Sequence, residues 1–182
     1  MIFRPLAVGG AYLIEPERVA DERGFFARTW CAREFAARGI HAVWVQGGVS
    51  FNPKAGTLRG MHYQMAPHAE AKLVRCARGA IYDVVVDLRR ESPSFLTWAA
   101  VELTAENGLS LYVPEGVAHG FQTLAEDTEV AYQLSAYHAP EAARGVRWDD
   151  PRLGIAWPPC RERIISARDR SYPDIEACGA SS

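Results

Sequence analysis

The chain has few cysteines and no long hydrophobic run. Its four cysteines, Cys31, Cys76, Cys160 and Cys178, include no CxxC pair. A disulfide framework is not expected in a chain of 182 residues that is 48% hydrophobic. No stretch is long and apolar enough to span a bilayer, and the first residues lack the basic segment and apolar core of a signal peptide. We therefore expect a cytoplasmic protein with no membrane partner.

Neither sign of charge dominates the composition. The chain has 20 Lys and Arg residues against 22 Asp and Glu residues, which gives a formal net charge of −2 at pH 7. A surface that binds nucleic acid usually carries an excess of basic residues, so no nucleic-acid partner is expected. The length suits one domain with a sizeable core, and we expect residues 1–182 to form a single domain.

Short apolar stretches separated by turn residues predict an all-β protein. The stretches are Val43–Val45, Leu73–Cys76, Ile81–Leu88, Trp98–Leu103, Leu109–Val113, Phe121–Leu124 and Val130–Leu134. The expected breaks include Gly47-Gly48, Gly79, Glu106-Asn107-Gly108 and Pro114-Glu115-Gly116. Many short strands at regular spacing indicate a sandwich or barrel. Residues 31–39 are the exception, because they have a helical pattern that closes on a glycine.

The segment 56–87 combines ionisable residues with an apolar strand pattern. Its charged and titratable side chains include Arg59, His62, Lys72, Asp83 and Asp87. Successive side chains of a strand point to opposite faces, so the alternation in 81–87 places carboxylates among apolar residues. Such groups are costly unless they pair or take part in chemistry. This segment therefore favours an enzyme.

Two basic side chains near His62 indicate an anionic ligand. A lone histidine is more often a hydrogen-bonded structural residue, but Arg59 and Lys72 lie close to it in sequence. A guanidinium suits phosphate through its two-pronged geometry. Lys72 is either an ordinary edge-strand lysine or a partly buried cation that stabilises a developing oxyanion.

A second motif, PEGVAHGF, contains His119 after a Pro/Gly turn. The spacing Pro-x-Gly-x-x-His matches the second motif of the cupin barrels. Metal-binding cupins carry His-x-His and a Glu in their first motif, whereas this chain has His62-Tyr63-Gln64, with Glu70 as a poorly spaced substitute. At most two good ligands remain, so no metal is expected.

Ordered motifs along most of the chain resemble those of the nucleotide-sugar 3,5-epimerases. The motifs are DERGFF, LRGMHYQ, AKLVRC, IYDVVVDLR, SPSF, PEGVAHGF and WDDP. They match the RmlC-type dTDP-4-dehydrorhamnose 3,5-epimerase family from about Arg4 to Asp169. The resemblance implies a cupin-type β jelly roll, with a short helix in its N-terminal half and a peripheral C-terminal segment. It also implies a homodimer without cofactor or catalytic metal.

The resemblance assigns roles to individual residues. His62 matches the general base, Tyr132 the general acid, and Lys72 the group at the substrate ketone. Asp169 matches the carboxylate that orients His62, and Asp83 is a second candidate for that pocket. The residues that match groups binding the nucleotide, diphosphate or sugar are Arg23, Gln46, Arg59, His119 and Tyr137.

The chain departs from the family pattern on the expected recognition surface. Arg28 replaces a Glu, Gly47-Gly48 replaces Asp-Asn, and Arg168 replaces a Lys. These changes predict altered recognition of the nucleotide or sugar, while the base, acid and enolate-binding groups are intact. The expected substrate is a 4-keto-6-deoxy sugar linked to a nucleotide diphosphate, with dTDP as the expected nucleotide. The alternatives are a metal-dependent cupin enzyme and a cupin that binds a nucleotide sugar without turning it over.

Overall fold

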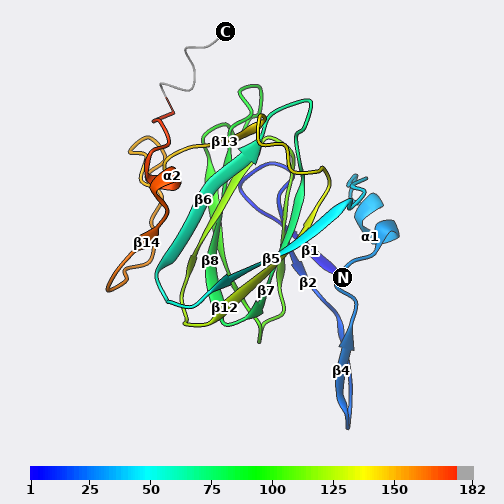
Figure 1. Cartoon of the computed structure of the whole chain (residues 1–182). Helices are drawn as coiled ribbons and strands as arrows, with labels where there is room; N and C mark the ends of the chain where they lie inside the picture. The colour runs from blue at the N-terminus through cyan, green and yellow to red at the C-terminus, as the bar shows by residue number, and fades with distance from the viewer. Residues whose placement is uncertain (176–182) are drawn as a thin grey trace.

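Two β-sheets pack face to face in the computed structural model, which describes residues 1–175 (Figure 1). In the order in which they lie side by side, the strands of the first sheet are β1 (Ile2–Pro5), β2 (Tyr12–Glu15), β10 (Ser110–Val113), β7 (Lys72–Arg78), β12 (Thr128–Leu134) and β5 (Gln46–Asn52). Those of the second sheet are β13 (Ala143–Gly145), β6 (Thr57–Gln64), β11 (Val117–Thr123), β8 (Ala80–Asp87) and β9 (Trp98–Thr104). All these neighbours are antiparallel, and β14 (Ile164–Ile165) pairs with β6 in parallel. The arrangement confirms the predicted all-β jelly roll.

The main core lies between the two sheets, because successive side chains of each strand alternate between the inner and outer face of its sheet. Val74 and Val130 come from the first sheet, and Val85, Val117 and Phe121 come from the second. All five side chains are buried. Burying such a side chain contributes about 1.5–3 kcal/mol, so these inward faces hold the sheets together.

A separate apolar layer covers the outer face of each sheet. On the first sheet, Phe35 of the helix α1 (Ala32–Ala36) packs edge-on against Tyr112 of β10, with ring centroids 6.1 Å apart. On the second sheet, Val84 and Val86 pack beneath the C-terminal segment through Leu153 and Trp157. The predicted short helix and peripheral C-terminal segment are therefore confirmed.

The turn glycines mark most strand ends correctly, but one predicted break is wrong. Gly79, with φ of +76°, joins β7 to β8, and Gly39, with the same φ, closes the turn after α1. Gly47 and Gly48 instead lie inside strand β5, whereas residues 43–45, expected as a strand, are irregular. Ladder pairing with β12 outweighs the low strand preference of glycine here.

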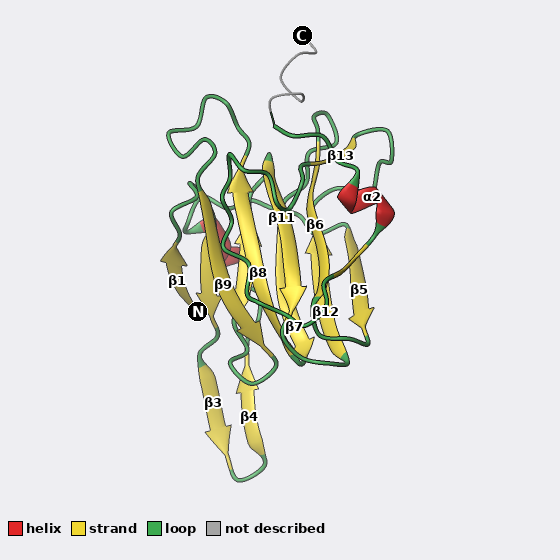
Figure 2. Cartoon of the chain, turned by 90° about the vertical axis from the view of Figure 1, so that its left-hand side faces the viewer, coloured by secondary structure: helices red, strands yellow, loops and turns green. Residues whose placement is uncertain are grey.

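One hairpin projects away from the sheets. It consists of β3 (Arg18–Asp21) and β4 (Gly24–Ala27), and it extends below the body of the molecule in both views (Figures 1 and 2). Its apolar side chains are exposed, with Phe26 at 69%. Across residues 1–175 the structure contains no helix with the length and apolarity needed to cross a membrane.

Candidate active site

A cavity of about 660 Å³ is lined by both sheets and by the segment that carries β14 and the short helix α2 (Ala167–Arg170). It brings together predicted site residues that are up to 121 positions apart in the chain, from Gly48 to Asp169. The predicted residues that line it are Gly48, Arg59, His62, Lys72, His119, Tyr132, Arg168 and Asp169. Strands β5 and β12 are neighbours in the first sheet, and β6 belongs to the second. In Figure 1 β14 and α2 lie on the left, along the outer edge of β6.

His62 and Asp169 form the central pair of this cavity. The Nε2 atom of His62 lies 2.8 Å from Oδ1 of Asp169, and the backbone N–H of Gly60 donates to Oδ2 at 3.2 Å. The hydroxyl of Ser166 caps α2 by accepting a hydrogen bond from the Asp169 backbone N–H. Burial raises the pKa of Asp169, but the hydrogen bonds and charge of its neighbours outweigh burial and lower that pKa overall. The carboxylate is therefore ionised at neutral pH and held in one orientation against the imidazole.

An irregularity in strand β6 allows two side chains three residues apart to face the same cavity. Perfect alternation would send Arg59 and His62 to opposite faces. The pairing with β11 shifts register between His119 and Phe121, and both Arg59 and His62 line the cavity. Gly60 and Gly120 meet at this point: a Cβ on Gly60, whose φ is +139°, would lie 2.5 Å from Gly120 Cα. Only paired glycines permit this close approach of the two backbones.

A second histidine–carboxylate pair lies deeper, between the sheets. His119 Nε2 is 2.6 Å from Asp83 Oδ1, and both side chains are buried. The other Asp83 oxygen, Oδ2, has no hydrogen-bond partner within residues 1–175. Asp83 does not line the cavity, whereas its hydrogen-bond partner His119 does.

The Tyr132 ring packs edge-on against His119, with ring centroids 6.2 Å apart. Burial, followed by the nearby negative charge of Asp83, raises the pKa of the Tyr132 phenol. The positive charge of Arg59 opposes that rise. The phenol therefore stays protonated at neutral pH and can donate a proton.

Lys72 presents a cation to the cavity from strand β7. Lys72 lies on the same face of β7 as the core residues Val74 and Cys76, so its ammonium group points inward. The ammonium donates to the His62 carbonyl oxygen at 3.3 Å and lies 3.2 Å from a Glu70 carboxylate oxygen. Both charged side chains are nearly buried, with exposed fractions of 9% and 10%.

Arg59 is held at the cavity wall by a buried amide. Its Nε atom donates to Asn52 Oδ1 at 2.8 Å. Asn52 in turn donates to the Thr128 carbonyl, so the end of β5 fixes the guanidinium against β6. This contact leaves further N–H groups of Arg59 for an anion in the cavity.

Comparison with known proteins gives the same assignment as the motifs. A model of the dTDP-4-dehydrorhamnose 3,5-epimerase family matches residues 5–177. The dTDP-4-dehydrorhamnose 3,5-epimerase of Sinorhizobium fredii is 41% identical over 175 residues, which cover 96% of this chain and 90% of that protein. The chain belongs to the dTDP-4-dehydrorhamnose 3,5-epimerase family. The predicted family and the predicted isomerase class are confirmed.

Solved structures of this family have the same fold. The dTDP-4-dehydrorhamnose 3,5-epimerase of Bacillus anthracis, with TDP and PPi bound, is 42% identical. It superposes with a TM-score of 0.87 over 91% of this chain and 94% of that one. The enzyme of Elizabethkingia anophelis is 36% identical and superposes with a TM-score of 0.94 over 97% of both chains.

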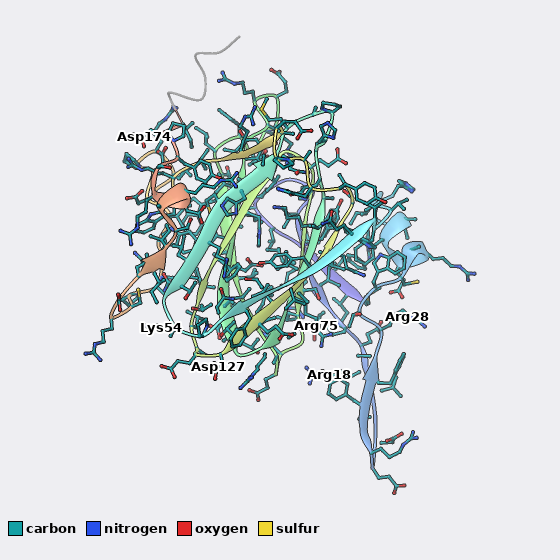
Figure 3. All side chains as sticks on the ribbon, in the orientation of Figure 1. Arg18, Arg28, Lys54, Arg75, Asp127 and Asp174 are labelled. Carbon is teal, nitrogen blue, oxygen red and sulfur yellow. The ribbon has the colours of Figure 1, made fainter. Side chains whose placement is uncertain are left out.

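Four predicted substrate contacts lie outside the cavity of this single chain. Arg23 is 85% exposed on the projecting hairpin, where it pairs with Asp21. Arg28 pairs with Glu34 beside α1, on the opposite side of the molecule from β14 and α2 (Figure 3). Their roles in binding stay predictions.

The other two contacts, Gln46 and Tyr137, lie next to a residue of the cavity wall. The Gln46 side chain accepts a hydrogen bond from the backbone N–H of His138, which does line the cavity. Tyr137 precedes His138 and is 70% exposed. Both therefore lie near the cavity, and their predicted contacts with substrate remain open to test.

Sequence reasoning missed several residues of the cavity or its support. Glu70 was considered only as a metal ligand, whereas its structural partner is Lys72. Neither Asn52 nor His138 belongs to a motif that indicates a functional role. The spacing of two residues between Glu70 and Lys72 was the one usable signal, because residues two apart in an extended segment can face the same way. In the structure Glu70 lies two residues before Lys72, the first residue of strand β7. Among residues 1–175, no three His, Cys, Asp or Glu side chains gather as a metal site would require.

Proposed function

We propose that this protein inverts C3, C5 or both carbons of a dTDP-linked 4-keto-6-deoxy sugar. It would do so by removing a proton beside the C4 ketone and returning one to the opposite face. The observation that carries the proposal is that one cavity brings together the His62 imidazole, held by Asp169, the protonated Tyr132 phenol and the Lys72 ammonium group.

The base side of the mechanism rests on the pair of His62 and Asp169. With Nε2 donating to the carboxylate, Nδ1 of His62 carries the lone pair that can accept a proton. A carbon-bound proton is acidic enough only when the ketone spreads the resulting charge onto oxygen. Asp169 then stabilises the imidazolium that forms as His62 takes the proton.

The acid side rests on the position of Tyr132 in the other sheet. His62 belongs to β6 of the second sheet and Tyr132 to β12 of the first, and both line the same cavity. A sugar ring bound between these walls would present one face to each residue. Removal and return of the proton on opposite faces is the requirement for inversion, so this arrangement supports epimerisation.

Lys72 is suited to hold the enolate oxygen. Its ammonium group is nearly buried, and a cation in such surroundings interacts more strongly with a developing oxyanion than it would in water. Glu70 and the His62 carbonyl fix its position, so little reorganisation is needed when charge develops on the oxygen. The ketone would thus be polarised by a protein side chain.

The remaining cavity wall suits a nucleotide diphosphate. Arg59 and Arg168 supply guanidinium groups, and His119 supplies an imidazole. The relative from Bacillus anthracis binds TDP, which supports dTDP as the nucleotide. Gly48 has open space where a side chain would stand, so the wall is wider here than with the family's Asn.

A homodimer would account for the residues on the projecting hairpin. Val19, Phe25 and Phe26 are exposed there at 70%, 56% and 69%, and Phe51 is exposed on the edge strand β5. Apolar surface of this extent is normally covered by a partner. In a dimer, Arg23 would reach a partner subunit instead of the cavity of its own chain.

Proton NMR in D₂O with a panel of 4-keto-6-deoxy nucleotide sugars tests the activity. We expect solvent deuterium at C3, C5 or both and product of inverted configuration with the dTDP-linked sugar. Deuterium-free, unchanged sugar with every member of the panel would refute the proposal. The dimer is tested separately by sedimentation of the wild type against Phe26→Ser, since a monomeric wild type would refute it.

A further inference from the structure

A second pocket, unconnected with the proposed chemistry, lies on the outer side of the β14–α2 segment. Its volume is about 340 Å³, and it is lined by Arg147, Trp148, Asp149, Arg163, Ile165 and Arg170. Ile165 also lines the active-site cavity, so the same short segment borders both pockets. Figure 3 shows Asp174, an ion-pair partner of Arg147, on this flank, away from the β3–β4 hairpin.

Among residues 1–175, two of the three arginines that line this pocket have no carboxylate partner. Arg147 is paired with Asp149 at 2.9 Å and with Asp174 at 3.3 Å. The Arg163 guanidinium donates to the neutral oxygens of Gln122 and Pro158, and Arg170 donates to the Ile165 carbonyl at 3.4 Å. Within the described part of the chain the pocket therefore has an excess of positive charge, although Asp149 is one of its lining residues.

The central guanidinium of Arg163 is fixed in place before any ligand arrives. Its Nε and Nη2 atoms donate to Gln122 Oε1 at 3.2 and 2.9 Å, and Gln122 is buried in strand β11. The guanidinium also lies over the Trp148 ring, 4.5 Å from its centroid. A half-buried cation that is already ordered loses little entropy on binding an anion.

We propose that Arg163 and Arg170, with the Trp148 ring as one wall, form a second binding site for a small phosphate-bearing anion. Arg163 keeps its Nη1 N–H groups for a phosphate oxygen, because its Nε and Nη2 donate to Gln122 and Pro158. Arg170 keeps the N–H groups of both terminal nitrogens, since only its Nε donates to another group of residues 1–175. Together the two guanidinium groups can hold a diphosphate or a phosphate ester. The apolar Ile165 and Trp148 surfaces favour an ester or a nucleotide over orthophosphate alone. This site does not depend on the proposed epimerase activity.

Calorimetric titration of the full chain with diphosphate, a phosphate monoester and orthophosphate tests the site. The active site is also proposed to bind diphosphate, so the titrations use Arg59→Gln as a common background. We expect one remaining site per chain, and Arg170→Gln should weaken its affinity by about tenfold or more. Arg161→Gln is the matched control, because Arg161 is exposed, lies two residues from Arg163 and lines neither pocket.

Two results would overturn the proposal. One is the absence of any binding in the Arg59→Gln background at low ionic strength. The other is an equal loss of affinity in Arg161→Gln and Arg170→Gln, which would mean that only general surface charge attracts the anion. Arg163→Gln is a weaker test because it also removes the bonds to Gln122 and Pro158, so the folded state of each variant is checked by thermal unfolding.

Discussion

Replacing Asp169 by asparagine tests the proposed role of the carboxylate that is hydrogen-bonded to His62. The substitution keeps the size of the side chain and removes its charge. In the wild type the Asp169 carboxylate accepts hydrogen bonds from His62 Nε2 at 2.8 Å and from the Gly60 backbone N–H at 3.2 Å. An asparagine has one acceptor oxygen, so it can satisfy only one of these donors and must turn its NH₂ group toward the other.

The expected loss has two components. A hydrogen bond to a charged group contributes about 1.5–3 kcal/mol, and its removal should slow proton abstraction roughly 10- to 100-fold. If the new NH₂ group faces His62, it donates to Nε2 and forces the proton onto Nδ1, the atom proposed as the base. An analogous tautomer change in a serine protease triad costs about 10⁴ in rate. We therefore expect a loss between about 10-fold and 10⁴-fold in kcat for Asp169→Asn.

The assay is the rate of deuterium incorporation at the proposed carbons, measured with KM over a range of substrate concentrations. A residue that orients the base should change kcat far more than KM. Asp127→Asn is the matched control, because Asp127 lies in an exposed turn near Arg78 and its φ of 49° suits asparagine. Exchange by Asp169→Asn within twofold of the wild-type rate would refute the proposed role of the carboxylate.

Three further predictions follow from other contacts. Tyr132→Phe should retain deuterium exchange but lose inversion by about 10²–10⁴, and inversion at the wild-type rate would assign the acid to another group. Gly120→Ala places a Cβ 2.8 Å from the Arg59 carbonyl oxygen and 2.9 Å from Gly60 Cα. We expect this variant to be destabilised by about 1–3 kcal/mol in chemical unfolding and to have lower activity. An unchanged unfolding free energy and unchanged activity would contradict the close packing. Folding lowers the pKa of Asp169 below its ordinary value of 3.8, so the ionised carboxylate stabilises the folded state above pH 3.8. This stabilisation is lost as the pH falls through the lower pKa of the folded state. The unfolding free energies of wild type and Asp169→Asn should therefore converge below pH 3.8, and a constant difference would rule out this linkage.

Chelation distinguishes the proposed mechanism from the metal-dependent alternative. In the proposed mechanism Lys72 polarises the ketone, as a metal would in a metal-dependent cupin, so we expect full activity after exhaustive chelation. Loss of activity that one divalent metal restores would favour a metal-dependent cupin.

The sequence alone determined the fold class, the family and the short-range features of the site. Alternation in 81–87 predicted a strand with inward carboxylates, and in the structure Asp83 and Asp87 are both buried. Turn glycines such as Gly79 were recognisable because their backbone conformation is rare for other residues. Ordered motifs over most of the chain identified the epimerase family before any geometry was known.

Only the tertiary structure decided which residues share a pocket. The pairing of His62 with Asp169, 107 positions apart, depends on β14 lying beside β6, and no local pattern specifies that contact. The common orientation of Arg59 and His62 contradicts simple alternation, because it needs the register shift where Gly60 meets Gly120. Arg23 lies on the projecting hairpin although its motif matched a substrate contact. Side-chain periodicity is a local property of the backbone, whereas a cavity is formed by packing between segments distant in sequence, so the first can be read from sequence and the second requires the folded chain.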